Sequence, residues 1–212
     1  MRPIVLTRQL ATADPNGIAE AQAVPGAVDL TLNGVLVVDG VAVLDAQRRV
    51  ALFSAGNIAA VIFTVYGRDY NGVEISDTVT GINNTTVETT LDFLEVTRIA
   101  ASATTGAETV IAGTTEVGAS QPLVLDIYLN PVNASVKVSI EGTLNVTVQY
   151  TNDPIFDTAP GDIEWTDDTD LDALTTGYTT GTIISPITAL RLLTNSGDGA
   201  ATITITQSGA TG

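Results

Sequence analysis

The sequence predicts an all-β protein of two antiparallel β-sandwich domains preceded by an N-terminal arm. Short runs in which apolar and polar residues alternate recur along the chain, and a period of two is typical of strands with one buried face. Asn-Gly, Asp-Gly and related turn dipeptides separate these runs. Aromatic residues make up only 5% of the chain, while Thr, Val, Ile and Gly are frequent, which favours strands over helices.

The N-terminal segment, residues 1–27, has two interpretations. Its weak alternation fits either the first strand of a domain followed by a loop, or an extended arm that pairs with the sheet edge of a neighbouring subunit. On the second interpretation, the start of the arm would contact a partner. The partner-binding residues would then be Arg2, Pro3, Ile4, Val5 and Leu6.

The first domain, residues 28–115, reads as a series of short strands. Asn33-Gly34 and Asp39-Gly40 both predict hairpins between neighbouring strands. Residues 85–103 follow neither the helical nor the strand period throughout. We expect a strand, a bend and a second strand there, with one short helix as the alternative.

The clearest hairpin of this domain covers residues 58–80. A two-residue loop would divide its apolar residues between the two faces. A three-residue loop, Tyr70–Gly72, pairs Phe63 with Val79 and keeps one face apolar. The sequence therefore predicts the three-residue loop, with Gly72 in the left-handed conformation.

A change in composition marks the start of the second domain, residues 116–212. Residues 114–122 are polar, contain Gly118 and end at Pro122, which is typical of a domain boundary. Alternating runs continue to the end of the chain, and the turn at residues 195–199 reads as a hairpin. The strands of both domains fit jelly-roll or Ig-like sandwiches.

The charge and composition exclude several classes of function. The formal net charge is −16, from 24 acidic and 8 basic residues, so the surface would repel nucleic acid and anionic membranes. The chain has no Cys and no His, which removes disulfides, Cys- or His-based zinc sites and histidine-dependent catalytic triads. We therefore expect a protein that is not an enzyme and needs no cofactor. No secretory signal is visible, which favours synthesis in the cytoplasm.

The densest group of acidic residues lies at residues 162–172. These residues are Asp162, Glu164, Asp167, Asp168, Asp170 and Asp172. The last three have the alternate spacing that opens an EF-hand calcium loop, but Ala173 stands where glycine is required and Thr179 where a bidentate Glu is required. We interpret the stretch as a solvated acidic loop, with a calcium site of another kind as the alternative.

Two stretches carry a resemblance to a known class of protein. One is RRVALFSAGNIAAVIFTVYGRDYNGVEISDTVTG, continuing through TTVETTLDFLEVTRIAAS, and the other is SPITALRLLTNSGDGAATITITQSG. Both resemble a pattern frequent in virion structural proteins of tailed bacteriophages. The resemblance implies a β-rich accessory component of the particle, assembled in the host cytoplasm and without catalytic residues.

The resemblance leads to a functional hypothesis with three alternatives. The first choice is a capsid decoration or cement protein on the outer capsid surface, a homo-oligomer such as a trimer, bound to the major capsid protein or other virion proteins. The nearest alternative is a neck, tail or fibre-attachment protein. A carbohydrate-binding adhesin module would require clustered exposed aromatic residues, and a polysaccharide-degrading enzyme would require two close carboxylates in a cleft.

Overall fold

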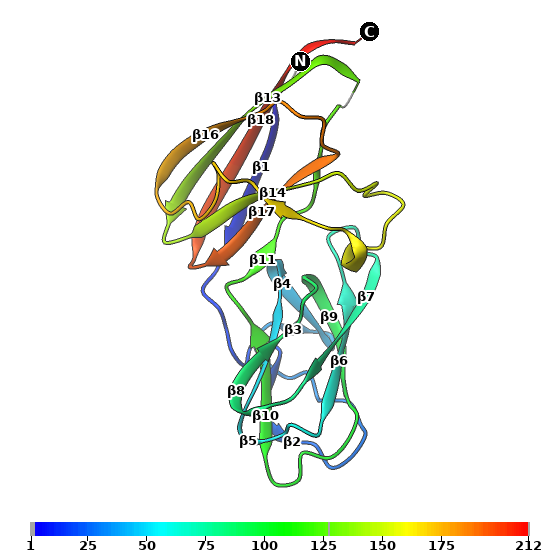
Figure 1. The fold of residues 1–212 in the computed structure, drawn as a ribbon. Helices are drawn as coiled ribbons and strands as arrows, with labels where there is room; N and C mark the ends of the chain where they lie inside the picture. Colours follow the sequence, from blue (N-terminus) through cyan, green and yellow to red (C-terminus); the bar gives the residue numbers. More distant parts are fainter. Residues whose placement is uncertain (1–2, 127, 212) are drawn as a thin grey trace. The chain divides into compact units, whose positions relative to one another are not determined.

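Strands and turns make up nearly all of the computed structural model, which describes residues 3–126 and 128–211 (Figure 1). Among these residues the one helical element is a short 3-10 turn, η1 (Pro160–Asp162). Thr12–Gly118 forms one compact unit, here called the inserted unit. The described residues on either side of it in sequence form a second, the flanking unit. Each contains two antiparallel sheets, which is consistent with two β-sandwiches and confirms the all-β prediction.

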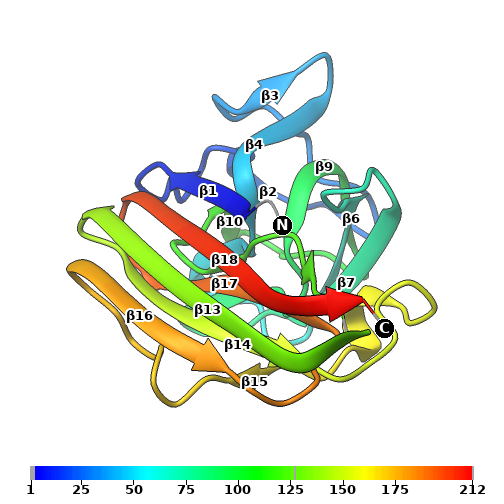
Figure 2. The ribbon, with the colours of Figure 1, turned by 90° about the horizontal axis from the view of Figure 1, so that it is seen from above.

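The flanking unit consists of sheets A and B. In spatial order, sheet A contains β1 (Ile4–Leu10), β18 (Gly199–Thr211), β13 (Leu129–Gly142) and β16 (Gly177–Ile183). Figure 2 shows these four strands side by side. Sheet B contains β11 (Gly118–Ala119), β17 (Ala189–Ser196), β14 (Asn145–Thr151) and β15 (Thr166–Asp167), and β12 (Leu123–Val124) also pairs with β17.

The inserted unit consists of sheets C and D. Sheet C contains β2 (Ala19–Ala23), β10 (Thr109–Thr114), β5 (Val50–Asn57) and β8 (Asn83–Glu88). Sheet D contains β3 (Val37–Val38), β4 (Val41–Arg48), β9 (Phe93–Ala101), β6 (Ile62–Arg68) and β7 (Glu74–Thr80). β8 and β9 confirm the expected strand, bend and strand over residues 85–103, so the helical alternative is wrong.

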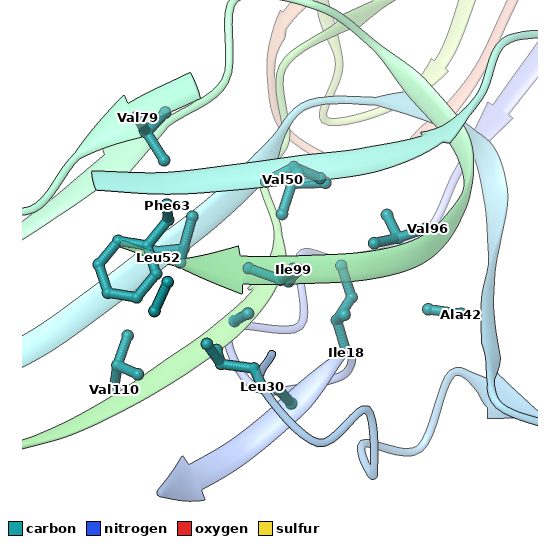
Figure 3. Packing of buried hydrophobic residues seen from close by; sticks show 14 of the residues in the cluster. Ile18, Leu30, Ala42, Val50, Leu52, Phe63, Val79, Val96, Ile99 and Val110 are labelled. Carbon is teal, nitrogen blue, oxygen red and sulfur yellow. The ribbon is translucent and has the colours of Figure 1, made fainter. Parts of the chain in front are cut away.

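Aliphatic side chains and two phenylalanines form the core of the inserted unit. Phe63, Leu52 and Ile99 are fully buried in one apolar cluster that receives residues from both sheets (Figure 3). Each such side chain contributes about 1.5–3 kcal/mol through burial. The core therefore follows from the alternating pattern of the strands, with aliphatic residues supplying most of the volume, as the low aromatic content predicts.

The predicted hairpin over residues 58–80 is confirmed in register and loop length. Phe63 lies opposite Val79, and the backbone N–H of Asp69 donates to the carbonyl of Val73, which leaves a three-residue loop. Gly72 has φ +75°, in the left-handed region. The Asp69 carboxylate accepts hydrogen bonds from the backbone N–H groups of Asn71 and Val73 and thereby holds the loop closed.

Of the other predicted hairpins, one is confirmed and two are wrong. Asp39-Gly40 joins β3 to β4 as a two-residue loop. Residues 28–32 are not a strand, and the N–H of Gly34 donates to the carbonyl of Ile18 rather than closing a hairpin. The turn at residues 195–199 connects β17 in sheet B to β18 in sheet A, so its flanking strands do not pair with each other.

No separate N-terminal arm is evident among the described residues, and this expectation is corrected. β1 pairs with β18 at seven consecutive positions, as the first-strand interpretation expects. Arg8 is buried: its Nε donates to Thr194 Oγ1 at 3.1 Å and its Nη1 donates to the carbonyl of Ala119 at 2.8 Å. Leu10 is also buried. These buried contacts make β1 an integral strand of the flanking unit.

A carboxylate closes the turn between β8 and β9. Asp77 on β7 accepts hydrogen bonds at Oδ2 from the backbone N–H of Thr90 at 2.6 Å, the Thr90 hydroxyl at 2.9 Å and the N–H of Leu91 at 3.0 Å. Burial alone would raise the pKa of Asp77, but these hydrogen bonds and one from Thr78 outweigh it, and the pKa is lowered. The ionised carboxylate therefore stabilises the fold.

We expect Asp77→Asn to destabilise the inserted unit by about 1–3 kcal/mol near neutral pH, because the amide removes charge-assisted hydrogen bonds. A lowered folded-state pKa stabilises above the unfolded-state pKa, and this contribution is lost as the pH falls through the folded-state value. Urea denaturation at neutral and strongly acidic pH should thus show a difference between variant and parent that disappears in acid. An equal difference at both pH values would contradict the assigned role.

Candidate functional site

Three of the predicted partner-binding residues, Ile4, Val5 and Leu6, lie in β1 of sheet A. Arg2 lies outside the described residues, and Pro3 is exposed just before β1 begins. Ile4 and Leu6 are half-buried on the side of β1 that carries the buried Arg8 and Leu10, whereas Val5 is 60% exposed on the opposite face. Because β1 is the edge strand of sheet A, this segment has both an open sheet edge and one outward apolar side chain.

The outward face of sheet A is rich in hydroxyl groups. Residues directly opposite each other on antiparallel strands point to the same face. The register therefore places eleven side chains together in the middle of this face, with Gln9, Asn133, Glu141, Ala200 and Ser208 at its two ends. The eleven are Val5, Thr7, Ser135, Lys137, Ser139, Tyr178, Thr180, Thr182, Thr202, Thr204 and Thr206. We call this set the hydroxyl face. Two of its hydroxyls, those of Thr7 and Thr202, are hydrogen-bonded at 2.9 Å.

The centre of the hydroxyl face carries an unusual charge for this chain. Lys137 is the only lysine in the sequence, is exposed, and lies opposite Thr204 on one side and Thr180 on the other. Its Nζ lies 5.1 Å from the ring centroid of Tyr178, which is 72% exposed. None of the ion pairs found among the described residues involves Lys137.

Carboxylates are nearly absent from this face. Among the described outward side chains of the four strands, Glu141 at the end of β13 is the one acidic residue. It lies four residues from Lys137, about 13 Å along an extended strand. In a chain with 24 acidic residues, the hydroxyl face is therefore a surface where an acidic partner meets little repulsion.

A second feature is a shallow depression of about 220 Å³ on sheet D, lined by Tyr66, Gly67, Arg68, Glu74, Ile75, Thr97 and Arg98. The guanidinium of Arg98 lies 3.9 Å from the Tyr66 ring centroid. Arg68 pairs with Glu95 at 3.3 Å, and Arg98 pairs with Asp29 at 3.6 Å. The two arginines of the depression are thus both paired with carboxylates. The volume of the depression is below the usual 300–1,000 Å³ of small-molecule sites.

The acidic stretch at residues 162–172 is held by internal hydrogen bonds. Asp168 Oδ1 accepts from the N–H groups of Asp170 and Leu171, and Asp172 Oδ1 accepts from the Thr147 hydroxyl at 2.6 Å. Within residues 3–126 and 128–211, no three acidic, His or Cys side chains are grouped so that they could hold a metal ion. At least two of the carboxylates in this stretch therefore hold the shape of the loop through hydrogen bonds.

Two more side chains of this region form a stacked pair. Arg191 Nε donates to Gln149 Oε1 at 2.7 Å, and the guanidinium lies 4.1 Å from the ring centroid of Trp165. Gln149 Nε2 in turn donates to Asp167 Oδ1 at 2.7 Å. The chain of contacts connects β14, β15 and β17 of sheet B, so its role is structural.

Three groups with shifted pKa values, Arg48, Tyr70 and Asp77, lie at separate positions in the inserted unit. Burial lowers the pKa of Arg48, which is 1% exposed and pairs with Asp45 at 2.9 Å. Burial also raises the pKa of Tyr70, in the β6–β7 loop. The shifts of Arg48, Tyr70 and Asp77 are each explained by local packing and hydrogen bonding.

Comparison with known proteins adds no assignment. No model of a known protein family matches the chain, and no curated protein sequence matches it. No helix in the described part of the chain has the length and apolar character needed to cross a membrane.

The sequence reasoning missed most of the hydroxyl face. Only Val5 belongs to the predicted partner-binding set. Two signals were present: the single lysine, and the alternation at residues 202–206, which places three threonines on one face of a strand. What the pattern lacked was the strand order that places Lys137 and Tyr178 beside those threonines.

Proposed function

We propose that the protein is a non-enzymatic virion structural protein of a tailed bacteriophage, a capsid decoration or cement protein on the outer capsid surface. The observation that carries this proposal is the hydroxyl face, a nearly carboxylate-free surface on an otherwise acidic chain. The resemblance of two stretches to virion proteins supplies the class of partner. The two sandwiches would be jelly-roll or Ig-like domains.

The proposed mechanism is bridging of neighbouring capsid subunits. β13 and β18 lie inside sheet A with strands on both sides, so the centre of the hydroxyl face is held rigidly. The edge of β1, with Pro3 and Val5, would add main-chain and apolar contacts to a capsid subunit. A homo-oligomer, with a trimer favoured, would present several such faces to the shell and gain avidity.

A neck, tail or fibre-attachment protein, the alternative, would bind its partner through the same surface. A decoration protein would have many binding sites per particle, whereas a neck or tail protein would have few. The carbohydrate-binding alternative has less support. Tyr178 is the single aromatic residue of the hydroxyl face, and the ring of Tyr66 in the sheet D depression is covered by Arg98.

Co-sedimentation with the empty, expanded capsids of the encoding phage tests the proposal. We expect saturable binding of many copies per particle and a higher temperature of capsid disruption, because each bound copy bridges subunits. Saturation at only a few copies per particle, with no gain in heat resistance, would favour the neck or tail alternative. Absence of binding by a folded chain would reject the decoration role.

A further inference from the structure

The hydroxyl face has a centre at which one specific contact is expected. Lys137 lies there on β13, and Tyr178 lies beside it on the edge strand β16, close enough for a cation–π contact. We propose that a protein partner presents an Asp or Glu carboxylate to the Lys137 ammonium and packs an apolar surface on Tyr178. The identity of the partner as a capsid protein rests on the proposed function; the chemistry of the contact does not.

The charge of Lys137 supports the carboxylate. The six basic residues with described side chains other than Lys137 all have a polar or charged partner. They are Arg8, Arg48, Arg49, Arg68, Arg98 and Arg191. Lys137 contacts only the Tyr178 ring among the interactions described, so its ammonium retains donors for a group from outside. Complementary charge across an interface favours encounter and fixes register.

The groups around Lys137 favour an oxygen-rich partner over an extended apolar one. The neighbouring positions on β18 and β16 hold Thr204 and Thr180, whose hydroxyls can donate to carboxylate or carbonyl oxygens. Acidic residues are concentrated elsewhere, so a partner carboxylate would be repelled from most of the surface and admitted here. The low density of acidic residues therefore favours binding at the hydroxyl face, and the charge of Lys137 fixes where on that face the carboxylate binds.

Tyr178 supplies the apolar part of the contact. It is 72% exposed, it is held from one side by the Lys137 side chain, and tyrosine is enriched among residues that dominate binding energy. Val5 lies in the neighbouring cross-strand row, the one that contains Lys137, and is directly opposite Thr204. The expected footprint therefore runs across the strands from Tyr178 to Val5.

Variants of Lys137 in the full chain test the contact by titration against empty, expanded capsids. We expect Lys137→Gln to weaken binding about tenfold or more, Lys137→Glu to weaken it further, and Lys137→Arg to retain most of it. Binding of the parent should weaken with added salt, and the slope should be smaller for Lys137→Gln. The matched control is Arg98→Gln, which removes another exposed cation that lies over a tyrosine ring and should leave affinity unchanged.

The outcomes separate this inference from the proposed function. If the parent binds capsids and Lys137→Glu binds equally well, the carboxylate contact is wrong and the proposed function stands. If the parent fails to bind capsids, the proposed function fails. If the parent then binds an acidic polysaccharide and Lys137→Glu does not, the inference that the partner is a protein is wrong as well. Circular dichroism should show no change in folding, because Lys137 is exposed.

Discussion

Deletion of residues 1–11 should lower the stability of the flanking unit by about 5 kcal/mol or more and leave the inserted unit unchanged. The deletion removes an edge strand paired at seven positions, the buried Leu10, and the hydrogen bonds of Arg8 to Thr194 and Ala119. It also exposes the edge of β18. Although β1 is followed in sequence by the inserted unit, its contacts belong to the flanking unit.

Calorimetry of the full and shortened chains should therefore show that one unfolding transition moves and the other does not. Trp165, the only tryptophan, lies in the flanking unit, and its fluorescence assigns the transition that moves. Leu10→Ala should reproduce part of the effect, about 2–5 kcal/mol, while Gln9→Ala on the opposite face should stay within about 0.5 kcal/mol of the parent. An unchanged flanking transition after deletion would mean that β1 is a dispensable arm.

Gly67→Ala should destabilise the inserted unit by about 3 kcal/mol or more. Gly67 lies on β6 where the register with β9 shifts, and a Cβ there would meet the backbone carbonyl oxygen of Glu95 at 1.9 Å and Phe93 at 2.8 Å. The carbonyl belongs to a central strand and cannot move without breaking the pairing of the sheet. The side chain can therefore be accommodated only by separating β6 from β9.

The matched control for this substitution is Gly26→Ala. A Cβ at Gly26 meets no atom within 4 Å, so its stability should equal that of the parent within about 0.5 kcal/mol. Urea denaturation followed by circular dichroism measures both. Similar small losses for the two variants would show that the strands at Gly67 separate more easily than their packing indicates.

The parts of the fold that the sequence predicted are those decided locally. In the hairpin over residues 58–80, only one loop length keeps the apolar residues on one face, so the register follows from neighbouring residues. The hairpin predicted from Asn33-Gly34 is wrong because Gly34 is needed for a close approach of two segments and not for a turn. A Cβ on Gly34 would lie 2.2 Å from the carbonyl oxygen of Gly17. A dipeptide alone does not distinguish a turn from a close approach of two segments.

The site depends on strand order, which short-range patterns do not encode. Thr7 and Thr202 are hydrogen-bonded although 195 residues separate them. The alternation in β1 is compatible with an arm as well as with an edge strand, and the buried Arg8 that decides between them looks like a surface residue in the sequence. Likewise, Lys137 and Tyr178 become neighbours only when β13 and β16 pair.

Electron microscopy of expanded capsids saturated with the chain tests the central claim most directly, because it locates the binding sites and the face that contacts the shell. The account predicts ordered density at three-fold or quasi-three-fold positions, with sheet A of the flanking unit against the capsid and Tyr178 inside the contact. Density confined to the unique vertex, or contact through the inserted unit with the hydroxyl face open to solvent, would contradict it.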